Sequence, residues 1–187
     1  MSTKAIAPRA AGGPAVASLA EPPAFDDVFS EHARYVGRTL RYLGIAEAEL
    51  EDACQEVFIA VHRRLAEFDP AGSVRAWLRQ ICIHVAQNQR RTRRRRREEG
   101  GADMIEVESP ATQHDAAERS EMRERLLALL ARLDEQQRAV FVLYEIERMS
   151  MAEVAAALSC PVQTAYSRLH AARARLEEAV RRNEATP

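Results

Sequence analysis

The clearest pattern of hydrophobic and polar positions lies between Ser73 and Arg97. Apolar side chains recur there at helical spacing and form one continuous stripe, made of Val74, Trp77, Leu78, Ile81, Cys82 and Val85. A second face repeats at the same period and is polar, made of Gln80, His84, Gln87, Asn88 and Arg91. Such side chains hydrogen-bond to base edges and phosphates. The pattern predicts a long helix that buries one face and offers another to nucleic acid.

Two amphipathic helices are predicted before this one. The first begins at Phe25 and ends at Gly44, a suitable C-terminal cap. The second spans about 47–67 and has an apolar face made of Ala53, Val57, Ala60, Val61 and Leu65. Another of its faces is made of Asp52, Gln55, Glu56, Ile59 and Arg63. Faces of this kind are usually only solvated, but an exposed isoleucine among carboxylates favours a protein-binding surface.

The C-terminal third predicts more helices. A leucine stripe from Leu126 to Leu133 precedes Asp134, which is placed to cap the next helix. Ser150 and Glu153 form a capping box for a short helix, and the turn at 159–161 leads into a longer one. The longer helix turns one face inward (Ala165, Leu169, Ala172, Leu176) and another outward (Gln163, Tyr166, Ser167, His170). This is the helix-turn-helix pattern, although many αα-hairpins share it.

Charge is segregated along a chain whose formal net charge is only -1. The 90–97 segment is almost entirely arginine, and an acid-rich stretch follows it at once. A block of like charges is often only a solvated tail, but this one continues a helix with a polar face, which favours phosphate contact. Residues 1–23 are rich in Ala, Pro and Gly and are predicted to be a disordered tail, and 98–118 a flexible acidic linker.

The chain is therefore predicted to be all-α, with two small helical domains at 24–97 and 119–184 joined by that linker. The 3 cysteines are far apart, which argues against disulfides and zinc knuckles and fits a reducing cytosol. No run is long enough to insert into a membrane. The sequence contains no glycine-rich phosphate loop, no nucleophile with an ordered base and no metal-ligand spacing, so we expect a non-enzyme without cofactors.

In order along the chain, several stretches resemble the extracytoplasmic-function (ECF) group of RNA polymerase sigma factors, within the sigma-70 family. These stretches are ELEDACQEVFIAVHRRLAEFD, VRAWLRQICIHVAQNQRRTRRRR and LARLDEQQRAVFVLYEIERMSMAEVAAALSCPVQTAYSRLHAARARL. The resemblance covers about 25–97 and 118–182. It implies that 24–97 is sigma region 2, that 119–184 is region 4, and that the protein directs core RNA polymerase to promoters.

The resemblance also implies roles for the two N-terminal faces. The face with Asp52, Gln55, Glu56 and Ile59 would dock on the coiled-coil clamp of the polymerase β′ subunit. The residues near the melted −10 element would be Phe68, Ser73, Gln80, His84, Gln87, Asn88 and Arg91. Unstacked bases expose edges and faces that a duplex hides, which suits capture of a single strand.

For the C-terminal helix, the resemblance implies contact with the −35 duplex through Gln163, Thr164, Tyr166, Ser167, Arg168, His170 and Arg173. It further implies contacts with the β subunit, an anti-sigma factor as partner, and a cytoplasmic location that an anti-sigma factor can shift to the inner membrane. The family usually has Asn in place of His84, Asp in place of Asn88 and Gly near Ser159.

Two alternatives stay open at this point. One is a stand-alone helix-turn-helix transcription regulator, for which the face around Asp52 would be dispensable. The other is a helical adaptor whose arginine run binds acidic proteins and not DNA.

Overall fold

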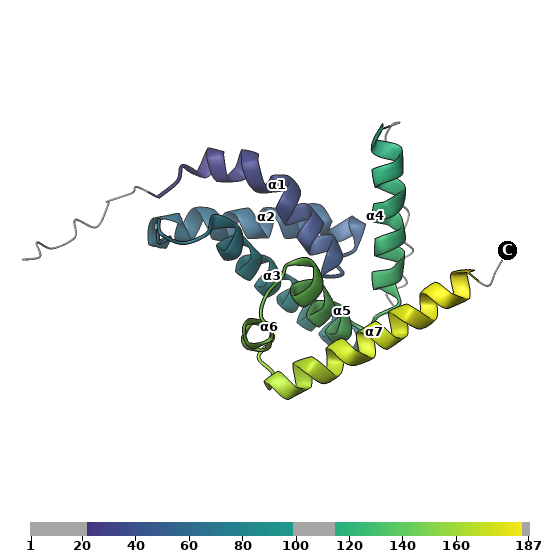
Figure 1. The fold of residues 1–187 in the computed structure, drawn as a ribbon. Coiled ribbons are helices and arrows are strands. Elements are labelled where there is room, and N and C mark those ends of the chain that lie inside the picture. The colour runs from purple at the N-terminus through teal and green to yellow at the C-terminus, as the bar shows by residue number, and fades with distance from the viewer. Residues whose placement is uncertain (1–21, 99–114, 185–187) are drawn as a thin grey trace, which may run out of the picture.

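The structure is a computed structural model that describes residues 22–98 and 115–184 (Figure 1). Within these ranges the chain forms helices joined by turns, without a strand, so the all-α prediction is confirmed. Nearly all of the predicted tail, and residues 99–114 of the predicted linker, lie outside the described residues. Helix begins again at Asp115, inside the range assigned to the linker.

The N-terminal half consists of three helices, α1 (Phe25–Tyr42), α2 (Glu47–Arg64) and α3 (Val74–Glu98), with a 3₁₀ turn at Leu65–Glu67 after α2. Their apolar faces meet in a shared core because each helix presents residues at three- and four-residue spacing. The most completely buried side chains are Val36, Leu40, Ala53, Val57, Val61, Leu78 and Cys82. The apolar stripes predicted for α2 and α3 therefore face this core.

The ends of these helices follow their sequence signals. Gly44 has φ 95° and closes α1 with two backbone hydrogen bonds, from Gly44 N–H to Arg41 O and from Ile45 N–H to Leu40 O. This is the glycine-terminated arrangement that satisfies the last carbonyls of a helix. The Ser73 hydroxyl accepts the Ala76 N–H at 3.3 Å and caps α3 as predicted.

The C-terminal half contains α4 (Asp115–Ala131), α5 (Glu135–Phe141), α6 (Met151–Ala157) and α7 (Val162–Glu184). Asp134 caps α5 by accepting the amides of Gln136 and Gln137. The Ser150–Glu153 capping box is present in both directions. Helix α6, the turn and α7 form the predicted helix-turn-helix, in which Ala165, Leu169 and Ala172 are buried.

The segment between α5 and α6 was not predicted in detail. Helix α5 continues into a π-helical turn, η2 (Val142–Ile146), after which Arg148 adopts φ 58°. The wider turn leaves Glu147 at the helix end, where its N–H donates to Val142 O at 2.9 Å. Single π-helical turns often occur at functional positions. Here the turn aims Glu147 at the other half of the molecule.

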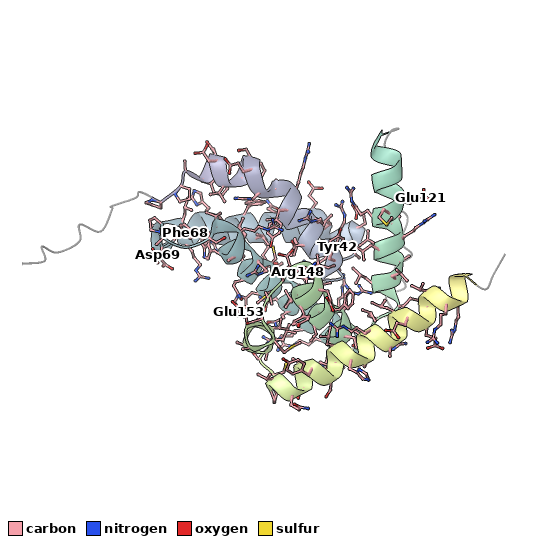
Figure 2. The ribbon with its side chains drawn as sticks, viewed as in Figure 1. Tyr42, Phe68, Asp69, Glu121, Arg148 and Glu153 are labelled. Atoms are coloured by element: carbon pink, nitrogen blue, oxygen red, sulfur yellow. The ribbon has the colours of Figure 1, made fainter. Side chains whose placement is uncertain are left out.

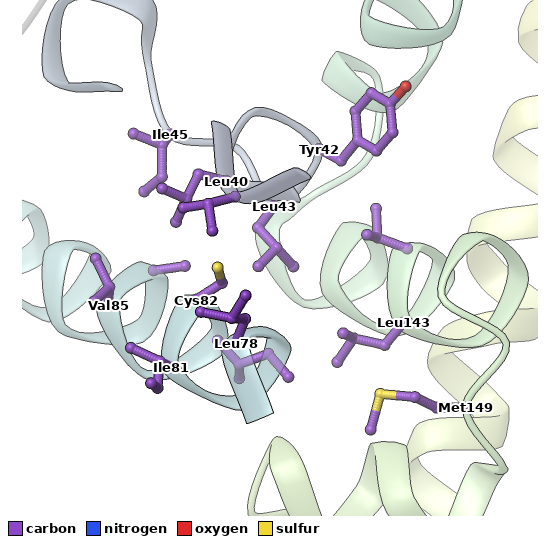
Figure 3. Close-up of a cluster of buried hydrophobic side chains, with 14 of the residues drawn as sticks. Leu40, Tyr42, Leu43, Ile45, Leu78, Ile81, Cys82, Val85, Leu143 and Met149 are labelled. Carbon is purple, nitrogen blue, oxygen red and sulfur yellow. The ribbon is translucent and has the colours of Figure 1, made fainter. Parts of the chain in front are cut away.

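The two halves pack against each other and share one hydrophobic cluster. Figure 3 shows Leu143 and Met149 of the C-terminal half beside Leu78 and Cys82 of α3 and Leu43, which directly follows α1, and all of these are buried. Helix α3 therefore has a third face, which the sequence analysis missed. That face lies against the C-terminal half and consists of Arg79, Ile83, Ala86, Gln87 and Arg90.

All three cysteines are free. Cys82 is fully buried in the core, and that burial raises the pKa of its thiol to about 12. The predicted packing role of Cys82 is confirmed.

The turn of the helix-turn-helix contains an avoidable strain. Ser159 has φ 50° and ends α6 with the same two-bond arrangement that Gly44 provides for α1. A left-handed conformation costs a residue with a Cβ about 1–2 kcal/mol, and glycine adopts it freely.

We expect Ser159→Gly to raise the free energy of unfolding by about 1 kcal/mol, measured by urea denaturation followed by circular dichroism. Ser30→Gly is the matched control, because Ser30 lies inside α1, where glycine should lower stability by about 0.5–1 kcal/mol. Equal effects of the two substitutions would contradict this account of the turn.

Candidate nucleic-acid interface

The four residues expected to bind polymerase lie together on one surface of α2. Asp52, Gln55, Glu56 and Ile59 are all exposed, and Ile59 keeps 44% of its surface accessible. This surface borders an apolar groove lined by Phe25, Phe29, Ala33, Cys54, Phe58 and His62. The groove is held by contacts between aromatic rings, including Phe29 against Phe58 with centroids 4.7 Å apart. Acidic and amide groups beside an apolar groove can bind a basic, amphipathic protein surface.

The turn before α3 holds two of the residues expected near the −10 element, Phe68 and Ser73. Figure 2 shows Phe68 and Asp69 at the end of the N-terminal half that lies away from α4. The Phe68 ring packs on Trp77 with centroids 5.1 Å apart, and Asp69 Oδ1 accepts the Ala71 N–H at 2.9 Å. Ser73 uses its hydroxyl as the cap of α3. The turn is thus a fixed platform with an aromatic surface that is partly accessible.

The polar face of α3 is divided between solvent and the protein itself. His84, Asn88 and Arg91 are exposed, and Gln80 is half-buried. Gln87 differs from them, because its side-chain Nε2 donates a hydrogen bond of 3.0 Å to the carbonyl of Ala157 at the end of α6. In this conformation Gln87 binds the helix-turn-helix and is not available to a nucleic-acid base.

The arginine run is only partly available to phosphates, which corrects the sequence interpretation. Arg90 is largely covered and donates to Leu43 O at 2.6 Å, and Arg93 pairs with Glu49 of α2. These two guanidiniums join α3 to the rest of the fold. Arg91, Arg94 and Arg95 are exposed, with Arg94 paired to Glu98 one turn away. A phosphate-binding surface would therefore begin with these exposed arginines.

The helix-turn-helix presents the expected outward face. Gln163, Tyr166, Ser167 and His170 are exposed on the first turns of α7, and Thr164 and Arg168 are half-buried. Arg173 donates to Glu145 Oε1 at 2.9 and 2.5 Å and lies 5.9 Å from the centroid of the Tyr144 ring. A row of amide, hydroxyl and imidazole groups on the second helix of such a motif can read base edges in a major groove.

A charged cluster lies between the halves, at a place where the sequence analysis proposed no function. Glu147 is buried, and its Oε2 accepts the Tyr35 hydroxyl at 2.7 Å and lies 3.8 Å from Arg79 Nη1. Burial and the neighbouring carboxylate raise the pKa of Tyr35 to about 12. The Arg75 guanidinium lies 4.4 Å from the centroid of the Tyr35 ring. No sequence motif marks this cluster, because its members come from α1, α3 and the segment after η2.

Two further expectations concern chemistry and membranes. Among residues 22–98 and 115–184, no group of three or more His, Cys, Asp or Glu side chains is arranged to hold a metal ion. In the same ranges no helix combines the length and apolar character needed to cross a membrane.

Comparison with known proteins gives two family matches on this chain. Residues 28–96 match sigma-70 region 2, and residues 123–176 match sigma-70 region 4. The RNA polymerase sigma factor CnrH of Cupriavidus metallidurans is 31% identical over 82% of this chain and 84% of its own. The sigma factor NccH of Alcaligenes xylosoxydans xylosoxydans is 30% identical over 92% and 91%. The chain belongs to the sigma-70 family of RNA polymerase sigma factors.

Solved structures agree with this assignment. CnrH in complex with the cytosolic domain of CnrY superposes with a TM-score of 0.55 at 28% identity, covering 87% of this chain and 89% of that one. RpoE of Bartonella quintana, in complex with the anti-sigma factor NepR, has the same fold, with a TM-score of 0.67 at 22% identity over 84% and 96%. Further relatives are named ECF sigma factors, and this chain is a member of that group.

The Glu145–Arg173 pair generates a prediction about duplex DNA. Exposed ion pairs are weak, so a phosphate can replace Glu145 as the partner of Arg173. We expect Arg173→Ala to lower the affinity for duplex DNA regardless of sequence and to reduce the slope of log K against log salt by about 0.9. Glu145→Gln should raise the affinity a few-fold.

Fluorescence anisotropy with labelled duplexes at several salt concentrations measures both effects. The matched control is Arg175→Ala, which removes an exposed arginine from the same helix two positions further on. If Arg173→Ala changes preference among sequences and leaves the salt slope unchanged, Arg173 contacts bases and not phosphate.

Proposed function

We propose that this sigma factor binds core RNA polymerase, directs it to specific promoters through −10 and −35 contacts, and promotes DNA melting. The observation that supports this most strongly is the presence of both sigma regions, in order, on one chain whose helix-turn-helix presents an exposed polar face. It acts by binding and deforming DNA and not as an enzyme, and it works in the cytoplasm.

Docking on the polymerase is proposed for the α2 surface. A helix that presents Asp52 and Glu56 one turn apart, with Ile59 beside them, supplies charge for recognition and an apolar anchor for affinity. The clamp coiled coil of the β′ subunit is the proposed partner, and the helix-turn-helix half would contact the β subunit. A stand-alone regulator would have no need of this surface. The exposure of these side chains therefore favours a sigma factor over a stand-alone helix-turn-helix regulator.

For the −10 element, we propose that Phe68, Ser73 and the exposed part of the α3 polar face hold the melted strand. The Phe68–Trp77 pair offers an aromatic surface on which an unstacked base can lie, and His84 and Asn88 offer hydrogen bonds to its edges. The exposed arginines that follow would contact the phosphates. The −35 duplex is assigned to Gln163, Thr164, Tyr166, Ser167, Arg168, His170 and Arg173 of α7.

An anti-sigma factor is the third proposed partner. CnrH and RpoE are similar to this chain and were both solved with a bound partner, which in the case of RpoE is called an anti-sigma factor. An inhibitor of this kind would have to cover the polymerase surface or the DNA surface described above, and one with a membrane anchor could hold the chain at the inner membrane.

The direct test combines purified chain with core polymerase and genomic DNA, followed by mapping of transcript starts. We expect a discrete set of starts that is absent with core polymerase alone. Asp52→Lys with Glu56→Lys should lower the affinity for core polymerase more than tenfold and abolish these starts, because like charges then meet across the interface.

Glu31→Lys is the matched control, since Glu31 is exposed on α1, outside the proposed surface. If the wild-type chain produces no specific start, the proposed function is wrong. If the double variant binds core polymerase as tightly as the wild type, the docking surface lies elsewhere.

A further inference from the structure

In this structure α3, which carries the proposed −10 face, is held against the helix-turn-helix, which carries the proposed −35 face. Gln87 of the proposed −10 face donates to the carbonyl of Ala157, the last residue of α6. Nearby, Nε of Arg90 in α3 lies 4.0 Å from Oε2 of Glu135 at the start of α5. Gly44 at the end of α1 also contacts Arg138, whose Nη1 would lie 2.5 Å from a Cβ added to that glycine. The halves are therefore closed upon one another.

This closed conformation is incompatible with simultaneous binding of both promoter elements. The start of α7, Val162, follows Ala157 by five residues, so at about 3.6 Å per residue it lies within roughly 18 Å of Ala157. The −10 and −35 elements are about 25 base pairs apart by name, which at 3.4 Å per pair is on the order of 85 Å. The halves must separate before both elements can be read.

Glu147 is a buried carboxylate at this junction, and it is held there by side chains of the other half. Its side chain keeps 2% of its surface accessible, although it is a carboxylate. Its two partners, Tyr35 and Arg79, both belong to the N-terminal half. Figure 2 labels the next residue, Arg148, which lies centrally between the two halves. Without the N-terminal half, Glu147 would lose both partners.

We propose that Glu147, held by Tyr35 and Arg79, is a latch that keeps the free chain closed. In the closed chain Gln87 is not available to DNA and the two reading surfaces cannot reach their elements together. The latch is thus a regulatory contact within the chain, and its meaning for transcription rests on the proposed function. Opening returns the Glu147 carboxylate to water and releases Gln87 from Ala157.

The chemistry of the cluster suits a latch that opens. Burying a carboxylate carries a large desolvation penalty, which a hydrogen bond and a cation at 3.8 Å offset in large part. An intact buried pair of this kind adds little net stability, whereas a mismatched pair is strongly unfavourable. The cluster therefore favours one relative position of the two halves without making their separation prohibitive. A partner that binds the open form can shift the equilibrium between the closed and open conformations.

Charge reversal tests the latch in the full-length chain. Glu147→Arg places a cation beside Arg79, and Arg79→Glu places a second carboxylate beside Glu147. We expect each substitution to open the chain and to raise its radius of gyration, measured by small-angle X-ray scattering, by about a quarter or more above that of the compact chain. The double swap, Glu147→Arg with Arg79→Glu, should restore the compact value.

Glu31→Arg is the matched control for the change in net charge, because Glu31 is exposed on α1, and it should leave the chain compact. Helix content measured by circular dichroism should stay unchanged in every variant. The two single substitutions lie in different halves. If each expands the chain and their combination restores the compact value, local unfolding is excluded as the cause of the expansion.

The proposal is overturned if Glu147→Arg is as compact as the parent chain, or if the double swap stays as expanded as the single variants. The scattering experiment contains neither polymerase nor DNA. A negative result therefore leaves the proposed function intact, and a chain that fails to start transcription leaves the latch intact.

Discussion

The burial of α3 on two sides is the constraint on which the rest of the structure depends. One side packs on α1 and α2 through the predicted apolar stripe, and another contacts the C-terminal half through Arg79, Gln87 and Arg90. A helix used in this way has only its remaining polar face for recognition. That face, with His84, Asn88 and Arg91, is limited to the width that the two interfaces leave exposed.

Much of the fold could be predicted because local signals agree with the global arrangement. The apolar periods of α1, α2 and α3, the glycine at the end of α1, and the capping residues Asp134 and Ser150 each specify an element without information from elsewhere. The helix-turn-helix was recognisable for the same reason: its small inward residues, such as Ala165 and Ala172, allow close approach of the helices.

What could not be predicted depends on contacts between distant segments. The arginine run looks uniform in sequence, yet Arg90 and Arg93 bind protein groups while Arg91 is exposed, and only the positions of Leu43 and Glu49 decide this. The third face of α3 has the same cause. Glu147 is an ordinary surface residue by type, and the π-helical turn and the packing of the halves are what bury it.

The central claim is that one chain carries two DNA-binding surfaces, the polar face of α3 and the outward face of α7. The two halves that carry them are packed together in the free protein and separate on the polymerase. Arg38 of α1 and Met122 of α4 are both exposed and line one groove where the halves meet. Dyes attached to cysteines at these positions report the separation by energy transfer, in a chain whose native half-buried cysteines are replaced by serine. We expect efficient transfer in the free chain and a large fall when core polymerase binds. Transfer that stays equally efficient in the complex would contradict the account.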